Sequence, residues 1–419
     1  MDSGKTVWQK NFTILYCSKL VKVIADSFAF NSILWFLILD GQGAIGTALL
    51  IAVTILPQVL IAPLISPLMK TDTLKFWMFS ADITRSILML LIPLSYFNGF
   101  SPLWFIISLM LIHSATGASY DPASVSLIPH IVTKDLIQKG NATIESSVQV
   151  VKLAAVMFCG VLIAVIGAAN TMLLTFPLYI ISAGLVLLIK YKLKDDKTKE
   201  KALNQKGTYL RKLKRGFVLV RNHQILFPLA IYCIFLNLGA APWEALSAVY
   251  ISEDLNGDSV IHAFLRVTTA IGAFFMGFIL TKVRVNRYGL LFVAAGIVEG
   301  TAFFITGINS YLILVLTAAF VLGSTISAIN VPEHTIIQTS VAEEDQPQVF
   351  AVIRMTSHVM IPLGALVGGY AATVFGAGKV IAFGGLIEIL AGVAILTLTK
   401  LSKTKRADLI KVKEESLKI

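Results

Sequence analysis

Charged residues are scarce in this chain of 419 amino acids. Asp, Glu, Lys and Arg together make up 14% of it, whereas soluble globular domains carry about 25%. Hydrophobic residues make up 56%. This balance excludes a soluble globular domain, a disordered chain and a collagen-like chain, and it indicates a protein embedded in a membrane.

Cysteine and the motifs of common enzymes are also nearly absent. The Gly4–Thr6 segment lacks the upstream glycine of a phosphate-binding loop, and no Gly-x-Ser-x-Gly sequence occurs. His113 and His358 have no second ligand at metal-binding spacing, so packing or hydrogen bonding is the expected role of both. We therefore predict no enzymatic activity, no metal site and no resident cofactor. The only cysteines lie in apolar runs and are expected to be buried small hydrophobes: Cys17, Cys159 and Cys233.

What the chain has instead is a series of long apolar runs. About 20 such residues in a helix cross the hydrocarbon core of a bilayer. Twelve runs meet this length, and they predict an all-α membrane protein with twelve transmembrane helices. They cover residues 14–39, 44–69, 76–97, 103–127, 141–168, 171–190, 225–251, 258–281, 288–307, 311–332, 350–374 and 379–400.

The net charge of +11 lies mainly in the connections between these runs. If the connections alternate between the two sides, one side holds nearly all the Lys and Arg residues, and the other side holds only Lys379. The positive-inside rule then places both termini and the central connection in the cytoplasm. The first run is too long for a cleaved signal peptide. We expect a multi-pass protein of the cytoplasmic membrane that binds no nucleic acid.

The chain divides into two similar halves. A basic stretch without a long apolar run separates residues 1–190 from residues 223–419, and we interpret 191–222 as a cytoplasmic linker. A shift by half the chain length superposes Pro122 on Pro332 and Ile131 on Val341. Parallel repeats of six helices are typical of transporters whose substrate pathway lies between two pseudo-symmetric bundles.

Several segments resemble one family of transporters. "LPQVLIAPLISPL", "SADITRSILMLL" and "PASVSLIPHIVTKDLIQKGNA" in the first half, and "QTSVAEEDQPQVFAVIRM" in the second, are similar to the macrolide-efflux and enterobactin-exporter branch of the major facilitator superfamily. The resemblance implies proton-driven export of a small molecule by a monomer. It also implies gating roles for Asp82 and Arg85. The family's acidic group after the second helix is replaced here by Lys70, and its Gly-Pro pair in the fifth helix by Ala155 and Val156.

The first helix carries charged residues inside its apolar run. Lys22 and Asp26 are four residues apart, so they lie on one helix face. Asp26 is a candidate proton carrier, and the alternative is a structural ion pair with Lys22. Lys22 and Lys152 are candidates to line a site for a carboxylate-bearing substrate. Simple charge pairs with Asp26 or Glu145 are the alternative for them.

The second half carries its own buried charges. Glu244 and Arg266 fall at matching depths of neighbouring helices, and we expect an interhelical pair or gate, with substrate contact as the alternative. Glu244 is the second candidate for proton coupling. Glu299 and Glu388 are expected to be structural or near lipid, and a protonated buried acid is the alternative.

The remaining candidates are assigned by position along the predicted helices. Tyr120, Asn237 and Trp243 are candidates for substrate contact, although core packing and interfacial anchoring are the commoner roles of aromatic residues. Arg354 is a further candidate for the substrate site. At Lys70 we expect either a weaker cytoplasmic latch or one that uses an acid of the connection between the tenth and eleventh helices, such as Glu343, Glu344 or Asp345.

From these features we expect a secondary active transporter driven by the proton gradient. A siderophore-like or metallophore-like zwitterion is the preferred substrate because of the cations along the pathway, and a macrolide-like drug is the alternative. An importer on the same fold and a membrane sensor without transport activity are the other hypotheses.

Overall fold

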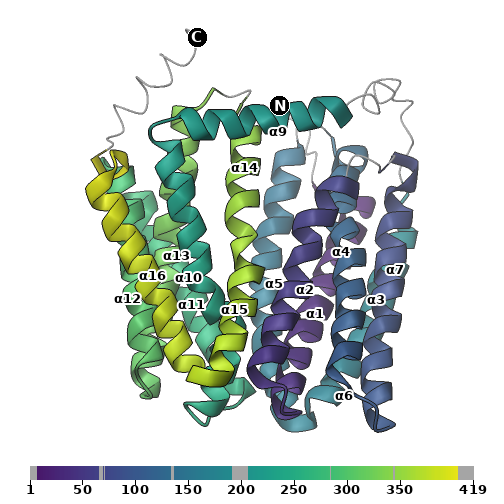
Figure 1. The fold of residues 1–419 in the computed structure, drawn as a ribbon. Helices are drawn as coiled ribbons and strands as arrows, with labels where there is room; N and C mark the ends of the chain where they lie inside the picture. The colour runs from purple at the N-terminus through teal and green to yellow at the C-terminus, as the bar shows by residue number, and fades with distance from the viewer. Residues whose placement is uncertain are drawn as a thin grey trace. The chain divides into compact units, whose positions relative to one another are not determined.

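The computed structural model describes residues 7–65, 69, 71–133, 136–190, 206–283, 285–342 and 345–403. Helices dominate these ranges, and none of the described residues forms a β-strand. Within these ranges, twelve helical spans are long and apolar enough to cross a membrane, which confirms the predicted fold class. Within each half of the chain, Figure 1 shows long helices that run roughly parallel or antiparallel to one another. The helices of the first half are α1 (Lys10–Leu39), α2 (Gly43–Ile65), α3 (Leu74–Phe97), α4 (Leu103–Ile131), α5 (Ile137–Ile166), α6 (Ala168–Leu173) and α7 (Thr175–Leu188).

The second half begins with α9 (Lys206–Asn222), which is not one of the twelve spans. Its spans are α10 (Leu226–Glu253), α11 (Ser259–Lys282), α12 (Tyr288–Gly307), α13 (Leu312–Ser340), α14 (Gln346–His358) with α15 (Met360–Phe375), and α16 (Ala377–Leu398). The predicted spans agree with these bounds within a few residues at most ends. The main exception is α13, which continues to Ser340 although its apolar run was expected to end at residue 332.

The two halves of the chain end corresponding helices in the same way. A glycine with a positive φ follows both α5 and α15, namely Gly167 at φ 84° and Gly376 at φ 87°. Only glycine adopts this conformation without strain. Pro122 and Pro332 lie inside α4 and α13, and both helices continue beyond the ends of the predicted spans, to Ile131 and Ser340. The turns beyond each proline are more polar, and a hydropathy criterion therefore ends the span too early.

The described chain separates into two compact units. The first holds residues 7–46, 53–190 and 258–263, and the second holds residues 47–52, 206–257, 264–283, 285–342 and 345–403. The first unit has an apolar core that includes Phe12, Leu15 and Met78, and α1 packs against α5 and α7. In the second unit, α16 packs against α10, α12 and α15. The predicted domain boundaries stay a prediction.

Small residues bring the helices of the second unit into close contact. A Cβ atom at Gly300 would lie 2.6 Å from the carbonyl oxygen of Gly385, and one at Gly239 would lie 2.7 Å from that of Gly384. Neither distance leaves room for a side chain. The backbones of α10 and α12 therefore approach α16 directly, as in other tightly packed membrane helices.

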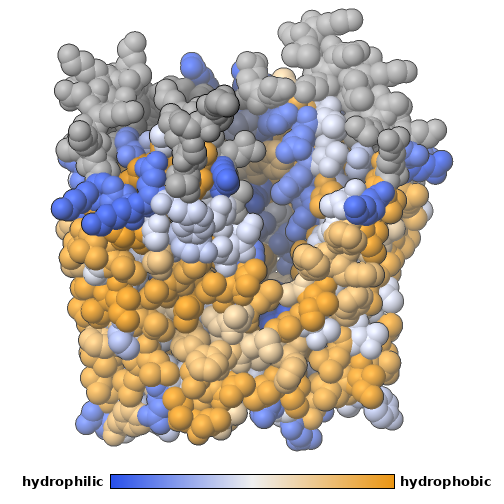
Figure 2. Space-filling view, turned by 180° about the vertical axis from the view of Figure 1, so that it is seen from behind, coloured by the Kyte–Doolittle hydropathy of each residue, from blue (hydrophilic) through white to orange (hydrophobic). Residues whose placement is uncertain are grey.

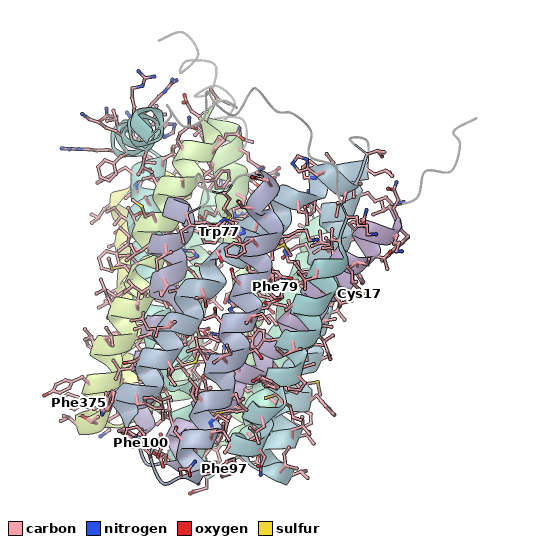
Figure 3. The ribbon with its side chains drawn as sticks, turned by 90° about the vertical axis from the view of Figure 1, so that its right-hand side faces the viewer. Cys17, Trp77, Phe79, Phe97, Phe100 and Phe375 are labelled. Carbon is pink, nitrogen blue, oxygen red and sulfur yellow. The ribbon has the colours of Figure 1, made fainter. Side chains whose placement is uncertain are left out.

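The surface fits a lipid environment. Figure 2 shows hydrophobic residues over most of the height of the molecule, with hydrophilic residues gathered toward its ends. At the turn between α3 and α4, the aromatic side chains of Phe97, Phe100 and Trp104 are exposed. Figure 3 shows Phe97 and Phe100 at one end of their unit. Aromatic residues favour this interface between lipid and water. Cys159 and Cys233 are buried, but Cys17 is exposed (Figure 3), contrary to expectation. An apolar run alone does not distinguish core-facing residues from the others.

Helix α9 lies in the stretch that we interpreted as a linker. It runs crosswise over the ends of α10 and α14 (Figure 1) and packs mainly on α14. Arg215 Nη2 lies 2.7 Å from Asp345 Oδ2, and a Cβ atom at Gly216 would clash with the backbone of Gln348. The described part of this stretch is thus a basic amphipathic helix held against its own unit.

Candidate functional site

An ion cluster in the first unit centres on Asp26 of α1. Its Oδ2 atom lies 2.9 Å from Lys22 Nζ, and its Oδ1 atom lies 3.1 Å from Arg85 Nη1. The hydroxyl group of Tyr179 donates a hydrogen bond to Oδ1 at 2.6 Å. One carboxylate therefore joins residues of α1, α3 and α7. The spacing of four residues between Lys22 and Asp26 places both on the face of α1 that meets these helices.

A second carboxylate, Asp121 of α4, extends the cluster. Lys22 Nζ lies 3.5 Å from Asp121 Oδ2, and Lys19 Nζ lies 3.6 Å from Oδ1. The ammonium group of Lys22 also lies 5.0 Å from the ring centre of Tyr120, within the range of a cation–π contact. Lys22 thus bridges the carboxylates of Asp26 and Asp121. The positive charges of the cluster lie close to its negative charges.

Neutral polar groups fix the positions of the charged ones. Ser182 donates a hydrogen bond to Asp82 Oδ2 at 2.6 Å, and His113 Nε2 lies 3.0 Å from the Tyr179 hydroxyl group. The side chain of Arg85 lies directly on Gly117 of α4, where a Cβ atom would be only 1.4 Å from Arg85 Nη2. Gly117 therefore provides the space that lets Arg85 reach Asp26.

Burial differs across the cluster. Lys22, Asp82 and Arg85 are 5%, 0% and 4% exposed, whereas the side chains of Asp26 and Asp121 are 32% and 57% exposed. Lys22, Arg85 and the carboxyl group of Asp82 are thus buried, whereas the carboxylates of Asp26 and Asp121 remain accessible. A small ligand with groups of both signs could exchange partners with these carboxylates and cations.

The second unit contains a simpler pair. Arg266 Nη1 lies 3.2 Å from Glu244 Oε2, which joins α10 and α11, and Arg266 Nη2 lies 3.4 Å from Ser247 Oγ. The side chains of Glu244 and Arg266 are 44% and 25% exposed. Trp243 is buried in a tilted contact with Phe303. The amide group of Asn237 donates to the backbone oxygen of Cys233 in its own helix.

Two candidate cations have exposed side chains and no ion pair among the described residues. Lys152 lies at the middle of α5, and Arg354 lies on α14. Neither Asp26 nor Glu145 pairs with Lys152; Glu145 instead accepts a hydrogen bond from Gln149 at 2.9 Å. Unlike the cations of the ion cluster, Lys152 and Arg354 are therefore available to a negatively charged ligand.

The predicted cytoplasmic latch is only partly described. Lys70 lies outside the described residues, as do Glu343 and Glu344. Asp345 is bound to Arg215 of α9. The ion pair of Asp345 that the structure contains therefore lies within the second unit.

Tyr179, Ser182 and Gly117 belong to the ion cluster but were not recognised from the sequence. Tyr179 and Ser182 lie in the apolar run of α7, where a single hydroxyl group does not by itself indicate a polar site. Gly117 is recognisable only once the position of Arg85 is known. No group of three potential metal ligands occurs in the described part of the chain.

A groove of about 560 Å³ lies on the first unit, between α2, α3 and α4. Its lining is mostly apolar, with Trp77, Ser80 and Thr116 among the residues that contribute, and Figure 3 shows Trp77 in its place on α3. No charged side chain lines this groove. It therefore offers no chemistry comparable to that of the ion cluster.

Comparisons with known proteins agree on the family. The sequence profile of the Major Facilitator Superfamily matches residues 21–364. The chain is 59% identical over 412 residues to YvqJ of Bacillus subtilis (strain 168), described as an uncharacterized MFS-type transporter, and covers 98% of both chains.

Solved structures show the same fold at low identity. A POT family transporter in complex with 5-aminolevulinic acid gives a TM-score of 0.70 at 10% identity, covering 93% of this chain and 96% of that one. A mutant of the nucleoside transporter NupG gives 0.67 at 11% identity, covering 93% and 100%. A bacterial homologue of the lysosomal transporter Spinster gives 0.66 at 13% identity, covering 97% and 99%. Together with the profile and the bacterial relative, these matches show that the chain belongs to the major facilitator superfamily and is a membrane transporter, not an enzyme.

Proposed function

We propose that this transporter is a proton-coupled exporter of a small molecule that carries both a carboxylate and a cationic group, such as a siderophore-like or metallophore-like zwitterion. Transport would proceed by alternating access in the cytoplasmic membrane, with both termini in the cytoplasm. The observation that carries the proposal is the accessible carboxylate of Asp26, which is bound at once by Lys22 and Arg85.

Antiport requires that the proton and the substrate exclude each other. A zwitterion could place its cationic group on Asp26 and its carboxylate on Lys22 or Arg85, and the exchange would conserve the total charge. A proton on Asp26 removes the partner of the cationic group and lowers the affinity for the substrate. Competition for one carboxylate would thus couple proton entry to export.

The charge of the substrate is supported by Lys152 and Arg354. Both cations are exposed within membrane spans and have no ion pair in the described ranges. A lipophilic cation would be repelled by them in a site of low dielectric constant. A carboxylate-bearing substrate is therefore favoured over a cationic macrolide-like drug. We further propose that Glu244, paired with Arg266, responds to protonation in the second unit.

The same cluster supports a second function. If the substrate is purely anionic, a proton on Asp26 would leave Lys22 and Arg85 with excess positive charge and would strengthen substrate binding. Proton and substrate would then move together, and the protein would act as a symporter that imports the anion. The sign of the proton movement separates this mechanism from the proposed antiport.

The first experiment identifies the substrate and the direction of transport. Metabolites in the medium of cells with and without the protein would be compared. The enriched compound would then be added to the cytoplasmic face of oriented proteoliposomes that contain a pH indicator. Antiport predicts alkalinisation of the lumen, and symport predicts acidification. Transport with no pH change in the lumen would refute proton coupling of either kind.

The second experiment tests the charge of the substrate. Lys152→Gln should weaken the apparent affinity for a carboxylate-bearing substrate about tenfold, because one charge-assisted hydrogen bond contributes about 1.5 kcal/mol. Lys139→Gln is the matched control, since Lys139 is also an exposed lysine of α5 but lies in its first turn. Equal effects of the two substitutions would contradict a specific role for Lys152.

A further inference from the structure

Glu388 is a fully buried acid in the middle of α16. Its relative exposure is 0%, and neither carboxyl oxygen has a hydrogen-bond partner among the described residues. The ion cluster around Asp26 does not include it. A buried polar group without a partner is rare in a native structure and calls for a physical explanation.

Two glycines form a seat for this side chain. A Cβ atom at Gly239 of α10 would lie 2.4 Å from Glu388 Cγ and 2.8 Å from its Oε1 atom. A Cβ atom at Gly300 of α12 would lie 2.8 Å from Glu388 Cβ. The Glu388 side chain is therefore enclosed between the backbones of two neighbouring helices. An alanine at Gly239 would displace its carboxyl group, and an alanine at Gly300 would press on its Cβ atom.

The helices around Glu388 supply no positive charge. Helices α10, α12 and α15 pack against α16, and none of the three contains a Lys or Arg residue. The only cation of α16 itself is Lys379, about 13 Å away along the helix axis at a rise of 1.5 Å per residue. Lys403 belongs to the short 3-10 helix Leu401–Lys403, which also packs against α16, but it lies beyond the C-terminal end of α16. Among the described residues of these elements, no cation is therefore positioned next to Glu388.

The neighbouring helices also carry acidic residues, and their negative charge would further disfavour an ionised Glu388. Glu299 of α12 is 8% exposed and accepts only a hydrogen bond from Thr325 at 3.3 Å. The acids of α10 are Glu244, which is bound to Arg266, and Glu253 at the end of the helix. The remaining groups that titrate on these three helices are the thiol of Cys233 and the phenols of Tyr232, Tyr250, Tyr288 and Tyr370.

An isolated carboxylate in an apolar interior is too costly to keep and takes up a proton instead. A second acid nearby disfavours the ionised form further. We propose that Glu388 holds a proton in a site formed by α10, α12 and α16, with Glu299 as its nearest acidic neighbour. A metal cation would require several further oxygen ligands, and the described residues contain no group of three metal-ligating side chains.

This proton site does not depend on the transport mechanism proposed above. It makes no use of Asp26, and it can be tested without a substrate. The experiment is infrared spectroscopy of the purified full-length protein at neutral pH, in H₂O and in D₂O. A protonated carboxylic acid has a C=O stretching band that shifts on deuteration, whereas a carboxylate lacks this band.

We expect Glu388→Gln to remove the C=O band of one carboxylic acid per chain. Glu145→Gln is the control, because Glu145 is an exposed acid of α5, and its replacement should leave the spectrum unchanged. An unchanged band in Glu388→Gln, or a loss of that band in Glu299→Gln alone, would overturn the proposal.

Folding provides an independent check. The Gln side chain is neutral and nearly the same size as protonated Glu, so Glu388→Gln should fold with a thermal midpoint close to that of the wild-type protein. Failure of this variant to fold would mean that the ionised carboxylate is required, and it would also overturn the proposal. Gly239→Ala should disturb the same band, because the new methyl group would displace the carboxyl group from its seat.

Discussion

Replacement of Gly117 by alanine should break the ion pair between Arg85 and Asp26 without changing any charge. The new Cβ atom would lie 1.4 Å from Arg85 Nη2 and 2.3 Å from Cζ. Ordinary contact begins at about 3.5 Å, so the guanidinium group must move by about 2 Å. Such a shift removes the contact of 3.1 Å with Asp26.

The expected loss of stability follows from the burial of the two partners. Breaking a fully buried ion pair typically costs about 3–5 kcal/mol. Asp26 is 32% exposed and keeps Lys22 and Tyr179 as partners, so water and these groups compensate in part. We therefore expect a loss of about 2–3 kcal/mol, close to the contribution of one or two hydrogen bonds to a charged group.

The assay is denaturant-induced unfolding of the purified protein in detergent, together with proton movement in proteoliposomes. Gly184→Ala is the matched control, because Gly184 also lies inside a helix but a Cβ atom there meets nothing within 4 Å. This control should be neutral or stabilising by up to about 1 kcal/mol. If Gly117→Ala were as stable and as active as the control, Arg85 would not be held on Gly117 and the proposed cluster would be wrong.

Three further predictions concern single groups. Asp26→Asn should abolish substrate-driven proton movement while substrate exchange remains measurable; retained uphill transport would remove Asp26 from coupling. Exchanging Glu244 and Arg266 for each other should retain more transport than either single substitution, and a double variant no better than the singles would argue against the pair. His223 Nδ1 accepts hydrogen bonds from the backbone N–H groups of Ile225 and Leu226 at the start of α10, and burial lowers the pKa of His223. Only the neutral ring accepts these bonds, so stability should be complete above the unfolded pKa of about 6.5 and should fall as the pH decreases toward the folded pKa; His223→Ala should remove this dependence.

The architecture could be predicted from the sequence because apolar runs of the length of a membrane span recur along the whole chain. Apolar runs of the length of a membrane span predict helices regardless of tertiary contacts, and most predicted spans lie within a few residues of the observed helices. The errors occur where helices extend beyond the apolar region, as at Ser340 of α13. The amphipathic helix α9 was missed because it is basic and its apolar face is short.

The candidate site was predictable only in part. Spacing of four residues placed Lys22 and Asp26 on one face of α1, and the structure brings Arg85 to the same carboxylate. The contribution of Tyr179 depends on how α7 is rotated against α1, which apolar periodicity in a membrane does not determine. The burial of Glu388 depends on Gly239 and Gly300 in two other helices, and no pattern within α16 reveals them.

The two units therefore hold acidic groups in physically different ways. Asp26 forms ion pairs with Lys22 and Arg85, so a proton that binds its carboxylate must compete with these two cations. Glu388 has no cation to displace, and a proton on it disturbs no ion pair among the described residues. A transporter couples a proton to movement only if protonation changes the relative free energies of two conformations. By this criterion we propose Asp26 as the coupling acid and Glu388 as the acid that keeps its proton throughout transport. Asp26→Asn should therefore uncouple transport, whereas Glu388→Gln should remain coupled; a loss of coupling in Glu388→Gln with Asp26 intact would reverse the two assignments.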